Sequence, residues 1–219
     1  SMELLQKEQR MRLTALSESY DFQYLLRNDE AKLSEWVRQQ AGRYDLDFVV
    51  VHTASALGEF SKANRRLLMN GEEQTFFQQL DEMALEDLHP NLPARAQIPL
   101  LSEGGIESKG LVSRSLIPVF NEQNNLQWIV DGGMLLNNST LLVDRIRDLV
   151  YASDTLPEGS IGTVTLFMDD IRVSTNVPLD SEQLNGRAIG TRVSDEVRRT
   201  VLTSGQTWVD RAYVYDDWY

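Results

Sequence analysis

Apolar residues recur every three or four positions in the first part of the chain, and this spacing predicts two helices. The first runs from Glu3 to Arg27, contains no Gly or Pro, and is rich in strong helix formers. Its apolar face is formed by Leu13, Leu16, Tyr20 and Tyr24. Asn28 and Asp29 interrupt the pattern and can cap a second helix, whose apolar stripe lies within 33–44.

The period then changes to one typical of strands. The β-branched run Leu46–His52 predicts a buried strand, and 58–61 is its expected returning partner. Apolar residues at 76–88 fall at helical spacing, so a helix is expected there, ended by the prolines at 90 and 93. Two strong strand patterns, Gly110–Phe120 and Gln127–Leu136, predict a hairpin.

The last third repeats this alternation of helices and strands. A helix is expected from Asn137, followed by strands at 161–168 and 171–175 joined by an Asp169-Asp170 turn. Ser194 is the expected N-cap of a helix that ends before Gly205. The segment 206–215 alternates with period two and is expected to be a strand.

Composition and charge narrow the class of protein. The formal charge of −12 repels phosphate backbones and anionic lipids, so no nucleic-acid partner is expected. Without cysteine the chain has no disulfide, thiolate nucleophile or cysteine-based zinc site. No apolar run spans a bilayer and no signal peptide is present, while Ser1-Met2 resembles a cloning scar. We therefore expect a segment excised from a longer protein.

Three segments of the C-terminal half resemble a known family. They are GSIGTVTLFMDDIRVSTNVP at 159–178, NGRAIGTRVSDEVRRTVLTSGQTW at 185–208 and RAYVYDDWY at 211–219. Together with the helix after the first hairpin, they resemble the double Cache family of bacterial extracytoplasmic sensors. The resemblance is strong over 110–219, whereas the first hundred residues match only in layout.

This resemblance implies an α+β fold with a long N-terminal helix and two PAS-like Cache modules built on antiparallel sheets. We expect a signalling and dimerisation helix at 1–28, a membrane-distal module at 29–136, a linking helix at 137–155 and a membrane-proximal module at 156–219. The family pattern leads us to expect two more strands and a transmembrane helix after Tyr219, so the second module is expected to be incomplete.

The same resemblance implies a function. The chain is expected to be the periplasmic sensor region of an inner-membrane sensor histidine kinase, with membrane contact only through transmembrane helices outside this sequence. It would bind an amino acid, organic acid or amine, need no cofactor, and form a homodimer through the apolar stripe of its first helix. Chemoreceptors and diguanylate cyclases are alternative outputs. A hydrolase with an α/β core and a structural module without a ligand are alternatives of other classes.

Neither catalytic nor metal-ligating residues are expected. The two histidines, His52 and His89, form no triad signature or zinc motif and are interpreted as structural or exposed. The acidic pairs Asp169-Asp170 and Asp216-Asp217 have cation-ligating chemistry, but a hairpin turn is the favoured interpretation of the first pair. Gly132-Gly133 is expected to permit a bulge or a close backbone approach.

The best binding candidate is Arg114, with Ser113 and Ser115 beside it and Asp131 on the neighbouring predicted strand. Alternation places Arg114 on one face with Leu116, and the two serines on the other. A guanidinium suits a ligand carboxylate, and Asp131 suits a ligand amine. A cross-strand salt bridge is the competing interpretation, and both stay open.

The second module has its own candidates, Arg172 with Thr175 and Arg211 with Tyr213. They occupy comparable strand positions in the segments that carry the resemblance. We interpret them first as residues that hold the module together, with ligand binding as the alternative.

Overall fold

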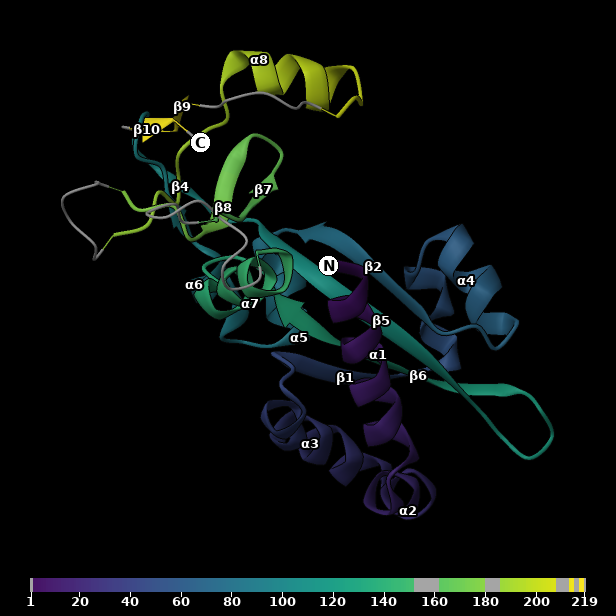
Figure 1. Ribbon diagram of the computed structural model, residues 1–219. Helices are drawn as coiled ribbons and strands as arrows, with labels where there is room; N and C mark the ends of the chain where they lie inside the picture. Colours follow the sequence, from purple (N-terminus) through teal and green to yellow (C-terminus); the bar gives the residue numbers. More distant parts are fainter. Residues whose placement is uncertain (1, 152–161, 180–185, 208–212, 215–216, 219) are drawn as a thin grey trace. The chain divides into compact units, whose positions relative to one another are not determined.

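The computed structural model describes residues 2–151, 162–179, 186–207, 213–214 and 217–218 (Figure 1). Contacts divide the chain into two compact units. The N-terminal unit comprises Met2–Leu92 and Val112–Leu135, and the C-terminal unit comprises Pro93–Leu111 and the chain from Leu136 onward. The architecture is mixed α+β, with a leading helix and an antiparallel sheet, as predicted.

A four-stranded sheet forms the centre of the N-terminal unit, with strand order β1-β6-β5-β2. Its strands are β1 (Phe48–Thr53), β2 (Gln74–Leu80), β5 (Gly110–Phe120) and β6 (Leu126–Leu135). Both β1 and β5 run antiparallel to β6. The predicted hairpin is therefore confirmed, and a bulge between Val119 and Phe120 lies at its turn end.

Helices lead into this sheet, but the predicted continuous helix over 3–27 is wrong. The structure has α1 (Met2–Glu18) and α2 (Tyr20–Asn28), followed by α3 (Glu30–Gln40) and the 3₁₀ turn η1 (Ala41–Tyr44). Ser19 has extended dihedral angles, and its hydroxyl accepts a hydrogen bond from the Phe22 N–H. Serine at this position therefore caps a new helix instead of continuing the old one. Asp29 caps α3 as expected.

This break divides the apolar stripe predicted for the first helix. Leu13 and Leu16 are fully buried in the core of their own unit, whereas Tyr20 is 80% exposed and stacks on Tyr24. The two leucines are thus not available to a second copy of the chain. Homodimerisation stays a prediction, without the support that we drew from that stripe.

The helix α1 lies against the sheet at Gly132. A Cβ atom added there would lie 2.6 Å from a methyl carbon of Leu13, so the glycine permits the close approach of helix and strand. A Cβ at Gly133 would lie 2.1 Å from the Ser113 carbonyl oxygen. The expectation of close backbone approach at this pair is confirmed.

The opposite face of the sheet is covered by η2 (Ala54–Glu59) and α4 (Lys62–Met69) through Phe60, Leu68, Leu116 and Ile129. The strand expected at 58–61 is therefore wrong. The helix expected at 76–88 is half wrong, because its first part is β2 and only its second part is α5 (Glu82–Leu88), capped by Asp81. Phe76 and Phe77 fall at helical spacing, but pairing of this segment with β5 favours a strand instead.

Short elements build the C-terminal unit. They are α6 (Leu92–Ala96, which begins at the unit boundary), β3 (Ile98–Pro99), β4 (Ile106–Glu107), α7 (Thr140–Val150), β7 (Thr165–Met168), β8 (Ile171–Thr175), α8 (Asp195–Val197), the π-helical turn η3 (Arg198–Thr203), β9 (Tyr213–Val214) and β10 (Asp217–Trp218). The β7–β8 hairpin and the Ser194 cap are confirmed. Of the strand predicted at 206–215, residues 208–212 and 215 lie outside the described part of the chain, 206–207 are not in a strand, and 213–214 form β9.

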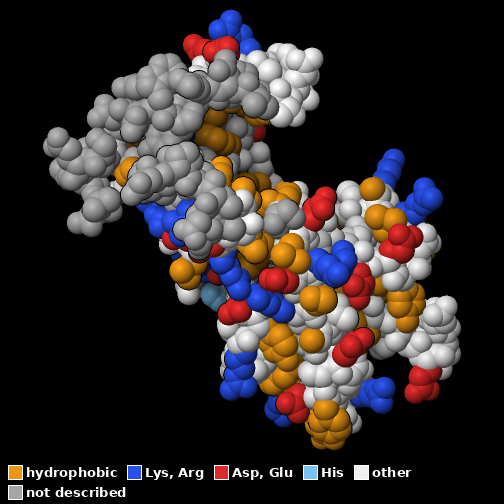
Figure 2. Space-filling view, viewed as in Figure 1, with side chains coloured by type: hydrophobic (Ala, Val, Ile, Leu, Met, Phe, Trp, Pro, Cys, Tyr) orange, Lys and Arg blue, Asp and Glu red, His pale blue; other side chains and the backbone are white. Residues whose placement is uncertain are grey.

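The predicted modules at 29–136 and 156–219 differ from these units, since α1 and α2 group with the sheet and 93–111 groups with the C-terminal unit. The module boundaries stay a prediction. Among the described residues, no helix is long and apolar enough to cross a membrane. On the face shown in Figure 2, acidic and basic side chains of these residues are interspersed with apolar ones.

Candidate functional site

Arg114 and Asp131 meet across adjacent strands, on the face of the sheet that α4 covers. Arg114 Nε donates to both carboxylate oxygens of Asp131, at 2.9 and 3.1 Å, and Nη2 donates to Oδ2 at 2.5 Å. The Asp131 side chain is fully buried, and the Arg114 side chain is 14% exposed. This is a two-pronged, charge-assisted pair of the kind that fixes a guanidinium in one orientation.

Further side chains complete the cluster. His52 Nε2 lies 3.1 Å from Asp131 Oδ2, and Gln78 Oε1 accepts a hydrogen bond from Arg114 Nη1 at 2.9 Å. The Phe60 ring packs beneath the Arg114 guanidinium at 5.6 Å and meets the His52 ring edge-on. Side chains from three strands and from the end of η2, where Phe60 lies, thus hold Arg114 from several sides.

The electrostatics of this cluster favour an ionised pair. Burial alone would raise the pKa of Asp131, but the positive charge of Arg114 and hydrogen bonds from His52 and Arg114 together hold it below its ordinary value. Burial opposes the charge of Arg114 as well, yet the Asp131 carboxylate raises the Arg114 pKa. Each charge is stabilised by the other, so neither is to be regarded as an isolated buried ion.

A small cavity opens beside the guanidinium. It has a volume of about 100 Å³ and is lined by His52, Glu59, Phe60, Ser61, Asn64, Phe76, Gln78 and Arg114. Within the described residues, the hydrogen bonds to Asp131 and Gln78 use three of the five guanidinium N–H groups. Two N–H groups therefore remain for a group that enters the cavity.

Ser113 and Ser115 lie apart from this cavity, on the α1 face of the sheet. The Ser115 hydroxyl accepts a hydrogen bond from the buried Gln9 amide at 2.9 Å and bonds Thr75 Oγ1 at 2.8 Å. Gln9 also donates to the Ser113 carbonyl oxygen. The structure therefore does not bring these serines to Arg114, in agreement with the alternation of the strand.

The candidates of the second module hold their own chain together. Arg172 Nη1 donates to Thr191 Oγ1, and its guanidinium lies 5.3 Å from the Phe167 ring. Thr175 Oγ1 bonds Thr165 Oγ1 across the β7–β8 hairpin at 2.7 Å. Arg211 lies outside the described residues, and of Tyr213 only the backbone position in β9 is described.

The glycine- and arginine-containing segment 186–192 also forms framework contacts. Arg187 binds both carboxylate oxygens of Asp144 in α7 and donates to the Thr175 carbonyl oxygen at 3.0 Å. Gly190 has φ +81°, and an added Cβ would lie 1.9 Å from the Pro99 carbonyl oxygen. Arg192 pairs with Glu103 and Asp170. Each of these contacts fixes the segment to another part of the same unit.

The acidic pairs give no metal site within the described residues. Asp169 takes a left-handed conformation in the β7–β8 turn, and the Asp170 carboxylate is paired with Arg192. Of the second pair, Asp216 is not described. No group of three acidic or histidine side chains in the described part of the chain is arranged to hold a metal ion.

Sequence reasoning missed three members of the Arg114 cluster. His52 was interpreted as structural or exposed, and neither Phe60 nor Gln78 was singled out. The register places His52 opposite Ile129, two residues from Asp131 on the same face. Strand alternation could have indicated His52, because Val50 and His52 of β1 lie opposite Asp131 and Ile129 of β6 and share one face of the sheet. This signal can be used only when the pairing of the two strands is known.

Comparison with known proteins adds one finding. Residues 134–219 match the family model of single Cache domain 3, which covers less than half of the chain. No curated protein matches the chain. Cache domains are extracellular sensory modules of receptors. The match includes Arg172 and Thr175 and excludes Arg114, and it supports a Cache sensor domain in the C-terminal part of the chain.

Proposed function

We propose that the chain is the extracytoplasmic ligand-sensing region of a transmembrane sensor histidine kinase. The observation that carries this proposal is the Cache match over 134–219, in a chain whose leading helix and antiparallel sheet agree with a PAS-like fold. The N-terminal unit would be the membrane-distal module of a tandem. A chemoreceptor or a diguanylate cyclase would use the same sensory region with another output.

The proposed ligand site is the Arg114 cavity. Asp131 is already engaged by Arg114 and His52, so its role is to orient the guanidinium rather than to grip an amine. The two remaining N–H groups of Arg114 suit a carboxylate. A volume of about 100 Å³ is smaller than a typical drug-sized site, so the best fit is an organic acid or amino acid of a few carbons.

A thermal-shift screen of small organic acids, amino acids and amines tests this site. A ligand at 100 times its dissociation constant adds about 2.7 kcal/mol to the stability of the folded state. Arg114→Ala should abolish the shift. Because that change leaves Asp131 buried without its partner, Arg114→Lys is the second variant, which keeps the charge and removes the planar fork. Arg38→Ala, on the exposed surface of α3, is the matched control and should bind as the unchanged protein does.

A structural module without a ligand is the second candidate, and one observation favours it. The Arg114–Asp131 pair is complete in itself, as a plain cross-strand ion pair would be. If no compound of the screen stabilises the protein, or if Arg114→Lys binds every hit with unchanged affinity, the structural candidate replaces the ligand site.

A hydrolase receives no such support. The pairings of β1 and β5 with β6 are antiparallel, whereas an α/β hydrolase core is built on a mostly parallel sheet. A screen for turnover of ester and phosphoester substrates remains the direct test of any enzymatic activity.

A further inference from the structure

A second, larger cavity lies in the N-terminal unit, between α2 and the turn of the β5–β6 hairpin. Its volume is about 460 Å³, within the range of small-molecule sites. Its lining residues are Gln23, Leu26, Arg27, Val119, Phe120, Asn121, Glu122, Gln123 and Gln127. Leu26 and Val119 pack against the core on the α1 face of the sheet, whereas Arg114 lies on the α4 face. This cavity, the α2 groove, is therefore separate from the Arg114 cavity.

The hairpin wall of the α2 groove is built by a fixed turn. Asn121 Oδ1 accepts hydrogen bonds from the Gln123 and Asn125 N–H groups, at 3.0 and 2.9 Å. The Asn121 N–H donates to the Asn125 carbonyl oxygen at 2.9 Å, and Asn124 takes a left-handed conformation. An asparagine that bonds its own turn in this way gives the wall a defined shape.

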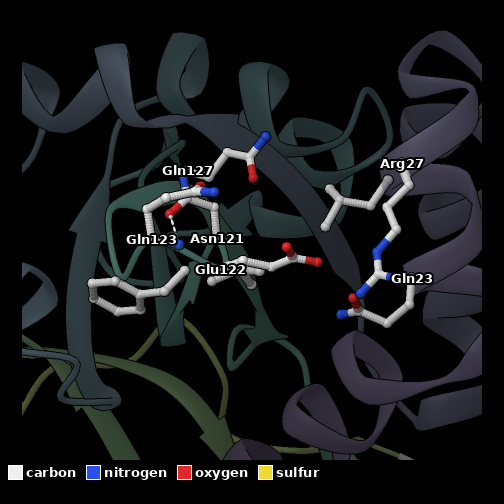
Figure 3. Close-up of a pocket in the computed structure, with 9 residues that line it drawn as sticks. Gln23, Arg27, Asn121, Glu122, Gln123 and Gln127 are labelled. Atoms are coloured by element: carbon white, nitrogen blue, oxygen red, sulfur yellow. Dashed lines mark hydrogen bonds between the residues drawn. The ribbon is translucent and has the colours of Figure 1, made fainter.

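Opposite charges occupy the two walls. Figure 3 shows the Glu122 carboxylate directed across the groove toward the helix that carries Gln23 and Arg27. Among the described residues, no ion pair or hydrogen bond engages the guanidinium of Arg27 or the carboxylate of Glu122. The two groups thus lie on either side of the groove without closing on each other.

Carboxamides and an apolar floor complete the lining. Gln123 and Gln127 add amide groups on the hairpin side, and each amide offers both a donor and an acceptor. On the helix side the Gln23 amide donates to the Ser17 carbonyl oxygen at 2.8 Å, which fixes its position and leaves its oxygen as an acceptor. Leu26 and Val119 supply partly buried apolar surface between these polar walls.

We propose that the α2 groove binds a short peptide of two or three residues. The carboxylate of such a peptide would pair with Arg27 and its ammonium group with Glu122, while the amides of the lining would bond its peptide group. A ligand without charged ends would make no use of the opposed charges on the two walls. This proposal stands independently of a ligand at Arg114.

Isothermal titration of the 219-residue chain with dialanine and alanylglutamine tests the groove, with N-acetyl-dialanine and dialanine amide as charge-blocked probes. Arg27→Gln should weaken dialanine about tenfold or more, and should leave the affinity for dialanine amide unchanged, because that probe has no carboxylate. Glu122→Gln should weaken dialanine likewise and leave N-acetyl-dialanine unchanged. Arg38→Gln and Glu86→Gln, on exposed surfaces outside the groove, should change neither affinity.

The outcomes separate this proposal from the one above. Absence of binding by both dipeptides up to several millimolar would overturn the groove as a peptide site, as would an equal loss of affinity for dialanine and dialanine amide in the Arg27 variant. Arg114→Lys should leave dipeptide binding intact. If it removes dipeptide binding together with the organic-acid response, the ligand occupies the Arg114 cavity and the assignment to the α2 groove is wrong.

Discussion

Arginine side chains serve different ends in the two units of this chain. In the N-terminal unit, Arg114 pairs with a fully buried carboxylate and directs the rest of its guanidinium toward a cavity. In the C-terminal unit, Arg172, Arg187 and Arg192 bond hydroxyl, carbonyl and carboxylate groups of their own framework. The Cache match covers these three arginines and begins after Arg114. Within the described residues, the arginines of the segment that matches the family thus bond their own framework, whereas Arg114, which lies beside a cavity, is outside that segment.

Burial makes this difference measurable. Asp131→Asn removes the charge that compensates Arg114 in a largely buried site, and we expect a loss of about 3 kcal/mol or more in the free energy of unfolding. Asp144→Asn removes the partner of Arg187, where both side chains are about 30% exposed, and should cost about 1 kcal/mol or less. Urea unfolding measures both.

Equal losses for the two variants would break the comparison, because they would show that the Arg187 pair is as deeply desolvated as the Arg114 pair. If the stability loss of Asp131→Asn disappears when Arg114→Met is introduced as well, the comparison becomes sharper. That result would assign the cost to the uncompensated charge rather than to the altered side-chain shape.

A smaller effect tests the framework role of the segment 186–192. Gly190→Ala places a Cβ atom against the Pro99 carbonyl oxygen in a left-handed conformation, and we expect about 2 kcal/mol of destabilisation. Gly104→Ala is the matched control, since Gly104 also has a positive φ but its Cβ would meet no atom within 4 Å. It should cost about 1 kcal/mol. Similar melting temperatures for the two variants would mean that the contact with Pro99 is not formed.

Much of the fold could be predicted from the chain, for identifiable reasons. The β5–β6 hairpin and the β7–β8 hairpin follow from local alternation and turn residues, which act over short sequence distances. The break at Ser19 was missed because serine is tolerated within helices and only the extended backbone at that residue reveals a cap. The strand at Gln74–Leu80 was missed because its pairing with β5 is a long-range contact that overrides helical spacing.

The residues of the candidate site also differ in whether local sequence or long-range contacts position them. The placement of Arg114 and Asp131 on neighbouring strands could be predicted because one hairpin joins those strands. His52 and Gln78 come from β1 and β2, whose positions beside β6 and β5 depend on tertiary register. The α2 groove was not foreseen at all, since it forms where a helix and a distant hairpin turn pack together.

Hydrogen–deuterium exchange of the unmodified chain, with and without the strongest organic-acid ligand of the screen, tests the central claim most directly. The claim is that the ligand binds at Arg114, outside the segment that matches the Cache family. The account predicts slower amide exchange in peptides that contain His52, Arg114 and Asp131, and unchanged exchange over 171–176 and 186–192. Protection confined to those two C-terminal segments, with none in β1, β5 or β6, would contradict it.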